Sequence, residues 1–219
     1  MKPQTCRLPT AAVMAVLGAA LASPAVLAQE VNIVKAGLIR YDTHSRTSGI
    51  KGIGIPPGAD ATTGDATTLI FVYERLLTPN IGVELVLGIP PRLKANAAGS
   101  VAFLGDDILS AKNVAPTVLA NYHFGNAGDT LRPYVGVGIN YTRFTGIRSS
   151  LAPKVEMSDS VGLAVQAGAN YMLSREWGLF ASVAKVQVKT DLVATASTVL
   201  TTTIDFRPIT YSFGVAYRF

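Results

Sequence analysis

The last eleven residues, Ile209-Thr-Tyr-Ser-Phe-Gly-Val-Ala-Tyr-Arg-Phe219, alternate between two kinds of side chain without interruption. Bulky apolar and aromatic residues occupy every second position from Ile209 to Phe219, and small or weakly polar residues, with Arg218, stand between them. A period of two predicts a β-strand. A soluble sheet would oppose the apolar row with exposed charges. Here the bulky row, with its aromatics near the end, is typical of a strand that faces lipid in a membrane barrel.

A strand of this kind that ends the chain on Phe219 resembles the closing strand of bacterial outer-membrane barrels. In that class, the terminal aromatic strand is also the signal read by the barrel assembly machinery. We therefore expect Phe219 to act as the assembly signal. The expected location is the bacterial outer membrane, with outer-membrane lipid and the assembly machinery as partners.

The composition agrees with a chain that is largely surrounded by something other than water. Of the 219 residues, 49% are hydrophobic and 15% are charged, and the mean hydropathy is +0.34. Soluble domains carry about 25% charged residues. The formal net charge of +5 comes from basic residues that are scattered singly, so it does not indicate a nucleic-acid partner.

Residues 1–28 have the features of a secretory signal peptide. Lys2 and Arg7 supply a positive start, residues 11–22 an apolar middle, and residues 26–28 a small-residue cleavage site. The sequence therefore predicts that these residues are removed.

The alternative at this end is a membrane anchor, because residues 8–29 carry no charge. The segment is rich in alanine and is interrupted by Pro9 and Pro24, which favours the signal peptide. The only cysteine, Cys6, leaves with it, so no disulfide or cysteine metal site is expected in the barrel domain, residues 29–219.

The rest of the chain is predicted to span the membrane as strands, because no segment has the ~20 consecutive apolar residues of a spanning helix. The eight expected strands are 31–42, 67–76, 81–91, 114–124, 132–145, 160–172, 177–190 and 204–219. In the third strand, for example, Ile81, Val83 and Leu85 are expected to face outward and Gly82 and Glu84 inward. The seventh strand is irregular, and a phase change from a bulge is expected near residues 182–185.

The connections between these strands alternate in length. The short ones are 77–80, 125–131 and 173–176, and the long ones are 43–66, 92–113, 146–159 and 191–203. Short periplasmic turns and long external loops, here expected to be mobile, are typical of outer-membrane barrels. The predicted fold is all-β, an eight-stranded antiparallel transmembrane β-barrel of the outer-membrane type with both termini periplasmic.

The soluble alternative is an eight-stranded ligand barrel of the lipocalin type. Such a barrel turns its bulky row inward and exposes a charged row to water. The second row here is rich in Gly, Ala, Ser and Asn and makes a poor water-facing surface.

Five segments, 78–85, 115–117, 132–144, 159–171 and 214–219, resemble the OmpW family in order along the chain. The most specific is Arg-Pro-Tyr-Val-Gly-Val-Gly-Ile-Asn-Tyr-Thr-Arg-Phe, residues 132–144. The resemblance implies an eight-stranded outer-membrane barrel with a narrow, largely apolar lumen. It also implies passage of small hydrophobic molecules, as in the alkane-uptake branch of the family, or a role as a colicin receptor.

The sequence departs from the family pattern in two places. After the third strand the family usually has Pro-Phe, a basic residue and His, whereas residues 90–94 are Pro-Pro-Arg-Leu-Lys. Trp177, the single tryptophan, lies beside a predicted turn, so no tryptophan is expected in the lumen. The identity of the solute therefore does not follow from the resemblance.

An eight-stranded barrel encloses space for side chains or one small ligand, so a pore of porin width is excluded. Polar and charged inward residues fall near the periplasmic end and are expected to form a plug: Glu74, Glu84, Asn121, His123, Arg132, Asn170 and Arg218. Higher inward positions are small or apolar and are expected to bind the solute: Ile70, Val86, Leu119, Gly136 and Gly138. The alternative for the charged set is a purely structural core network.

Three prolines suggest a lateral opening near the external mouth. Pro90 and Pro91 end the third expected strand, and Pro116 begins the fourth. Proline donates no hydrogen bond to a strand ladder, so pairing between these strands is expected to fail there. The alternative is that the prolines only end strands at a loop.

Catalysis and metal binding have little support in the sequence. His44 lies next to Ser45 in the first long connection, while His123 lies at the far end, so no Ser-His-carboxylate set is expected at one height. The histidines and carboxylates lack metal-ligand spacing, and no cofactor is expected. The two functions left open are passage or capture of small hydrophobic molecules, and a structural barrel whose loops contact colicin, phage or host.

Overall fold

The computed structural model describes residues 31–43, 45–47, 56–150, 152, 154–195 and 199–219. The expected signal peptide, residues 1–28, and His44 lie outside the described residues. Among the residues that the structure describes, no helix is long and apolar enough to cross a membrane.

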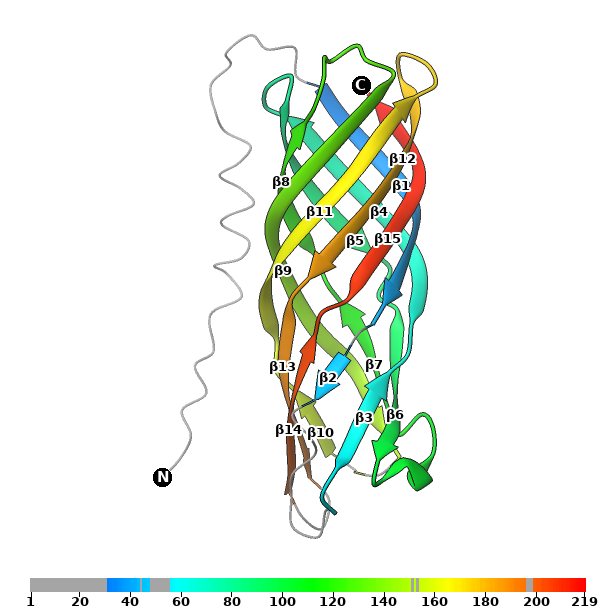
Figure 1. Ribbon diagram of the computed structural model, residues 1–219, viewed down its shortest axis with the longest axis vertical. Coiled ribbons are helices and arrows are strands. Elements are labelled where there is room, and N and C mark those ends of the chain that lie inside the picture. Colours follow the sequence, from blue (N-terminus) through cyan, green and yellow to red (C-terminus); the bar gives the residue numbers. More distant parts are fainter. Residues whose placement is uncertain (1–30, 44, 48–55, 151, 153, 196–198) are drawn as a thin grey trace, which may run out of the picture.

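Eight antiparallel strands form a closed ring (Figure 1). In ring order they are β1 (Val31–Asp42), β4 (Ala66–Leu76), β5 (Ile81–Gly88), β8 (Thr117–His123), β9 (Leu131–Ser149), β11 (Ser160–Met172), β12 (Trp177–Val186) and β15 (Ile209–Arg218). The ring closes because β1 pairs with β15 and β9 pairs with β11. The predicted eight-stranded barrel is therefore confirmed, and β1 and β11 have the predicted bounds.

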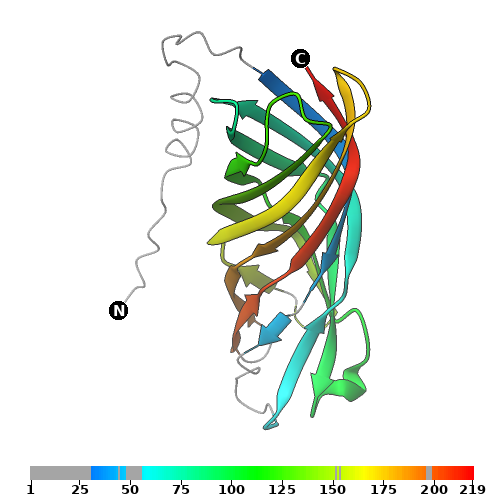
Figure 2. The same cartoon turned by 45° about the horizontal axis from the view of Figure 1, so that its top comes forward.

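The start of β1 and the C-terminus lie at the same end of the molecule (Figures 1 and 2). The three short connections lie at the same end, and we call it the turn end. The side chain of Asn80, in the first turn, donates hydrogen bonds to the carbonyl groups of His123 and Gly125 at 2.7 and 2.8 Å. The first turn is thus hydrogen-bonded to the second. We call the opposite end, where the long connections lie, the loop end.

The long connections differ from the expected mobile loops, because much of their described length is strand (Figure 1, lower half). These strands are β2 (Ser45–Thr47), β3 (Ala59–Thr63), β6 (Arg92–Gly99), β7 (Leu109–Val114), β10 (Lys154–Met157), β13 (Val188–Thr195) and β14 (Val199–Phe206), with a short helix, η1 (Ala102–Leu104). β7, β6 and β3 extend the barrel sheet from β9, and β10, β13, β14 and β2 form a separate sheet. The correction has a physical cause, since strands that leave the membrane still need partners for their backbone groups.

The two faces of the ring follow the predicted division. On β9, Val137 and Ile139 are each 57% exposed, whereas Tyr134 and Asn140 point inward and are 2% and 3% exposed. Aromatic residues gather on the outer surface of the barrel near the turn end, where the centres of the Trp177 and Tyr217 rings lie 4.9 Å apart. The bulky row thus forms the outer surface, with an aromatic girdle at one edge.

The expected phase change in the seventh strand is wrong. Burial alternates evenly along β12, with Ser182 inward and Val183 and Lys185 outward. The strand breaks instead at Gln187, whose N–H donates to the Leu163 carbonyl at 2.9 Å. Lys185 can face outward because it lies toward the loop end, beyond most of the apolar outer surface.

Candidate functional site

A buried ionic network closes the lumen near the turn end, and Lys35 of β1 is its centre. The Lys35 Nζ lies 2.9 Å from Glu74 Oε2 and 2.8 Å from Glu84 Oε2, and the three side chains are at most 3% exposed. Glu74 and Glu84 stand directly opposite each other on β4 and β5. Like charges in that position repel, and the Lys35 ammonium group between them offsets this repulsion.

Amide and imidazole groups complete this network. The Asn121 side-chain amide donates to Glu74 Oε1 at 2.8 Å and to Glu84 Oε2 at 3.1 Å. The His123 Nε2 lies 2.6 Å from Glu74 Oε1, and Gln166 donates to Glu84 Oε1 at 2.9 Å. The carboxylates are thus held by buried partners from β1, β8 and β11.

The structure brings four of the seven expected plug residues into direct contact, and the other three lie nearer the turns. Arg132 donates to the Pro79 carbonyl at 2.6 Å, and Arg218 donates to the Ala127 carbonyl at 2.9 Å. Asn170 is buried and is the cross-strand partner of Arg132. Arg132 and Arg218 therefore tie the turns to the barrel wall.

Lys35, Gln166 and Tyr134 belong to the closed region but were not among the expected plug residues. The Lys35 Nζ also lies 4.8 Å from the centre of the Tyr134 ring. One signal for Lys35 was available: two inward carboxylates on neighbouring strands need a cation between them.

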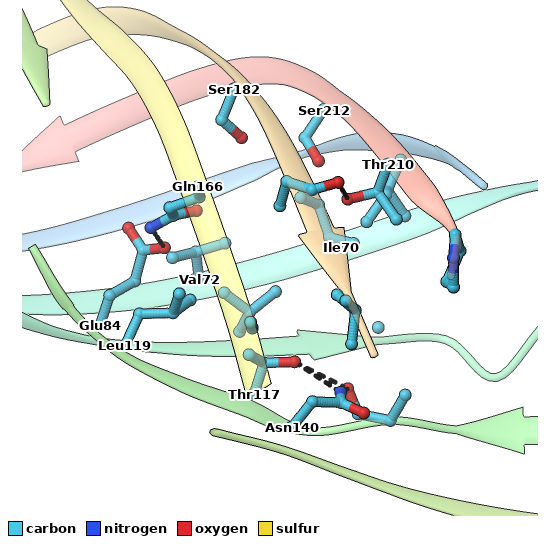
Figure 3. Close-up of a pocket in the computed structure, with 18 of the residues that line it drawn as sticks. Ile70, Val72, Glu84, Thr117, Leu119, Asn140, Gln166, Ser182, Thr210 and Ser212 are labelled. Atoms are coloured by element: carbon cyan, nitrogen blue, oxygen red, sulfur yellow. Dashed lines mark hydrogen bonds between the residues drawn. The ribbon is translucent and has the colours of Figure 1, made fainter. Parts of the chain in front are cut away.

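Above this floor the lumen widens into a pocket (Figure 3). Its cavity volume is about 70 Å³, and the empty space between its lining side chains, including solvent at the open mouth, is about 800 Å³. The lower wall is apolar, with Ile70, Val72, Leu119 and Phe180, and Glu84 and Gln166 belong to its floor. A polar ring of hydroxyl and amide groups surrounds the upper part: Thr117, Asn140, Ser182, Thr210 and Ser212. The apolar lower wall with a few polar groups above it is the kind of lining that small, mainly apolar molecules bind.

Of the five expected solute-binding residues, Ile70, Val86 and Leu119 line the pocket, whereas Gly136 and Gly138 do not. The two glycines are covered by neighbouring groups. A Cβ at Gly138 would lie 2.6 Å from the Leu119 Cα, and one at Gly136 would meet the Asn121 side chain. Because both residues lack a side chain, β8 and the Asn121 side chain can lie close against them. Neither glycine therefore lines the pocket, in contrast to the expectation.

A gap in the strand ladder lies between β5 and β8, at the height of the pocket. Pairing of these strands ends at Val86 and Thr117. Pro90 and Pro91 lie on one side of the gap and Pro116 on the other, all outside the strands. The two sides meet again toward the loop end, where the Asn113 N–H donates to the Pro91 carbonyl at 3.0 Å.

The pocket extends to this gap. Its lining includes Val86 and Gly88 on one side and Ala115 and Thr117 on the other. The side chain of Asn140 donates to the Thr117 hydroxyl at 2.8 Å and lies within 3.4 Å of the Ala115 and Pro116 carbonyls. The Pro116 carbonyl also accepts from the Tyr141 N–H of β9 at 3.0 Å, so the β8 side of the gap stays tied to β9.

Phe219 lies at the turn end, where its N–H donates to the Asn32 carbonyl at 2.9 Å. Its side chain is 59% exposed on the outer surface. Within the described ranges, no group of three or more His, Asp or Glu residues is placed to hold a metal ion. The arrangement can hold an apolar molecule above a closed floor.

The sequence model of the OmpW family matches residues 30–219. Outer membrane protein W of Vibrio cholerae is 30% identical over 215 residues, which cover 94% of this chain and 97% of that protein. Outer membrane protein AlkL of Ectopseudomonas oleovorans is 32% identical over 170 residues, 77% of this chain and 73% of that protein. The crystal structure of outer membrane protein OprG from Pseudomonas aeruginosa superposes with a TM-score of 0.81 and 25% identity, covering 86% of this chain and 95% of that one.

Proposed function

Because the chain belongs to the OmpW family and is a barrel of the bacterial outer membrane, we propose that it gives small hydrophobic molecules passage through that membrane. The molecule enters the upper lumen from the loop end. It rests in the apolar pocket above the ionic floor and leaves sideways, between β5 and β8, into the lipid.

The observation that carries this proposal is the continuity between pocket and gap. Gly88 and Ala115 both line the pocket and flank the region where β5 and β8 lose their pairing. On the outer side of the same region, Leu87 and Ile89 are 46% and 50% exposed. An apolar molecule that moves through the gap therefore passes from apolar side chains to lipid.

The floor argues against a straight path to the turn end. A molecule on that path would have to separate Lys35 from Glu74 and Glu84, and breaking a buried ion pair costs about 3–5 kcal/mol. An apolar molecule offers no replacement hydrogen bonds. The sideways path leaves the network intact.

The test is a pair of cysteines that closes the gap. Gly88→Cys and Ala115→Cys would be joined by oxidation or by a short thiol crosslinker, and uptake of a labelled alkane by liposomes would be measured. A matched control is Leu85→Cys with Val118→Cys, because these residues are already cross-strand partners.

We expect uptake to fall at least about tenfold when the gap pair is joined, and to recover on reduction, because the exit barrier rises by about 1.4 kcal/mol or more. The control pair should leave uptake within about twofold in both states. Equal uptake by the joined and reduced gap pair would exclude the lateral route.

A further inference from the structure

The outer face of the loop end carries four cations on neighbouring strands, and we call them the basic cluster. They are Arg92 of β6, Lys112 of β7, and Arg143 and Arg148 of β9. Their orientation follows from their neighbours, since Leu93, Ala111 and Phe144 pack inward in one buried apolar group. Arg92, Lys112 and Arg143 alternate with these residues and therefore point away from the lumen. Arg148 lies beyond a register shift in the pairing of β7 with β9 and follows Ile147, which packs against the same apolar group, so it also points outward.

Strand register brings these four residues together. Arg92 stands directly opposite Lys112. On its other edge, β7 pairs with β9. Ser110, two residues before Lys112, stands opposite Arg148, and Val114, two residues after it, stands opposite Arg143. Like charges opposite each other destabilise a sheet, so the isolated protein carries an electrostatic cost here.

Among the described residues, one carboxylate, Asp159, pairs with a cation of this cluster, Arg143. Other outward cations at the loop end have their own partners, Arg40 with Asp65 at 3.1 Å and Lys94 with Asp107 at 2.6 Å.

In the part of the chain that the structure describes, Arg92, Lys112 and Arg148 form no ion pair, and Arg143 is 4.0 Å from Asp159. Arg92 donates only to neutral groups, the Ser110 hydroxyl and the Gly146 carbonyl. Three of the four cations of the basic cluster thus lack a carboxylate partner in this part of the chain, and Arg143 has one only at 4.0 Å.

The cluster lies where the apolar outer surface ends. Ile89 is the last exposed apolar residue before Arg92, and it is 50% exposed. On β9, Ile139 is 57% exposed, and Arg143 follows four residues later. Val161 is 71% exposed and stands opposite Tyr141, so Arg143 lies two residues, about 7 Å along the strand, beyond the apolar surface. The polar layer of a bilayer extends about 5–8 Å beyond the hydrocarbon on each side. Arg143 therefore lies at the level of the lipid headgroups, and Arg148 lies farther out along β9.

We propose that the basic cluster binds the phosphate groups of a phosphorylated glycolipid in the leaflet at the loop end. Guanidinium groups bind phosphate oxygens in pairs, and an ammonium group adds a point charge. The acyl chains of the bound lipid would lie along Leu87 and Ile89, beside the gap between β5 and β8. The phosphates supply a negative partner for Arg92, Lys112 and Arg148, which have none among the described residues.

The test is native mass spectrometry of the detergent-purified protein with diphosphoryl lipid A and with the same lipid after removal of both phosphates. The variant is Lys112→Gln with Arg148→Gln. The control is Arg40→Gln with Lys94→Gln, which removes the same charge from sites that have carboxylate partners. All four side chains are at the surface, and retained resistance to detergent unfolding checks the fold of each variant.

We expect the wild-type protein to bind the diphosphoryl lipid at least about tenfold more tightly than the dephosphorylated one, because phosphate supplies the charge-assisted contacts. The cluster variant should lose about tenfold in affinity and the control less than about threefold. Equal binding of the two lipids, or an equal loss in the control, would overturn the proposal. Since no transport is measured, this outcome is independent of the lateral route.

Discussion

At the scale of single residues, Lys35 decides whether the lumen is closed. It is the one cation that contacts both Glu74 and Glu84 among the described residues, and its side chain is 1% exposed. Removing it would leave two facing carboxylates buried without a counter-charge. The floor therefore depends on a residue that also borders the pocket.

Replacing Lys35 by Met tests this dependence. We expect the free energy of unfolding, measured by urea titration in bilayers, to fall by about 3–5 kcal/mol, because an uncompensated charge stays buried. Adding Glu84→Gln should restore part of the loss. Arg40→Met is the control, since its exposed pair with Asp65 should contribute less than about 1 kcal/mol. A loss in Lys35→Met no larger than in this control would contradict the role of the network.

The sequence predicts the carboxylates of this network but not its cation, for a physical reason. Glu74 and Glu84 lie on strands whose outward row is clearly apolar, so their inward direction is evident. The first strand has apolar residues on both faces, with Ile33 inward and Val34 outward. Pairing with β15 and β4 then settles which way Lys35 points, and that pairing is not visible in the strand itself.

At the scale of elements, the contact between β8 and β9 explains why two expected lumen residues lie outside the pocket. Gly138 stands opposite Leu119, and their backbones approach closely. Inward position along a strand can be predicted from alternation, but the distance between neighbouring backbones cannot. The glycines therefore shape the wall of the lumen.

Two glycine substitutions separate wall packing from pocket lining. Gly138→Ala should lower the free energy of unfolding by about 1–3 kcal/mol, because the new Cβ would lie 2.6 Å from the Leu119 Cα. Gly88→Ala should change it by less than about 0.5 kcal/mol, because its nearest neighbours would lie at 3.6 Å. The same urea titration measures both, and equal losses would refute this account of Gly138.

The strands beyond the membrane also belong to the element scale, and the sequence did not reveal them. Residues 188–206 are rich in Thr, Val and Ala, without the bulky outward row that marks a membrane strand. In water no such row is needed, so the pattern that identifies the barrel strands is missing. Backbone pairing instead holds β13 and β14 together as a hairpin. It begins where Val188 stands opposite Phe206 and continues to Thr195, which stands opposite Val199.

At the scale of the whole molecule, the outward row sets the position in the membrane. Val137 lies in the middle of the apolar surface of β9, whereas Val161 is opposite Tyr141, toward the loop end. Both are well exposed, at 57% and 71%. Their local environments are similar, and their expected depths differ.

A lysine at each position therefore measures depth. Val137→Lys should lower the free energy of unfolding in bilayers by about 2–4 kcal/mol, because a charge at the midplane is poorly solvated. Val161→Lys should lower it by about 0–1 kcal/mol, because its ammonium group reaches the headgroups. If the Val161 variant lost as much as the Val137 variant, the placement of the apolar surface would be wrong.

The central claim is that an apolar solute occupies the upper lumen and leaves through the gap without crossing the floor. The most direct measurement uses an alkane carrying a diazirine, activated by light in bilayers containing the protein, with adducts located by mass spectrometry. Among inward-facing residues, the account predicts adducts at Gly88, Ala115 and Leu119 and none at the turn end. Adducts at His123 or Arg132, below the ionic floor, would contradict it.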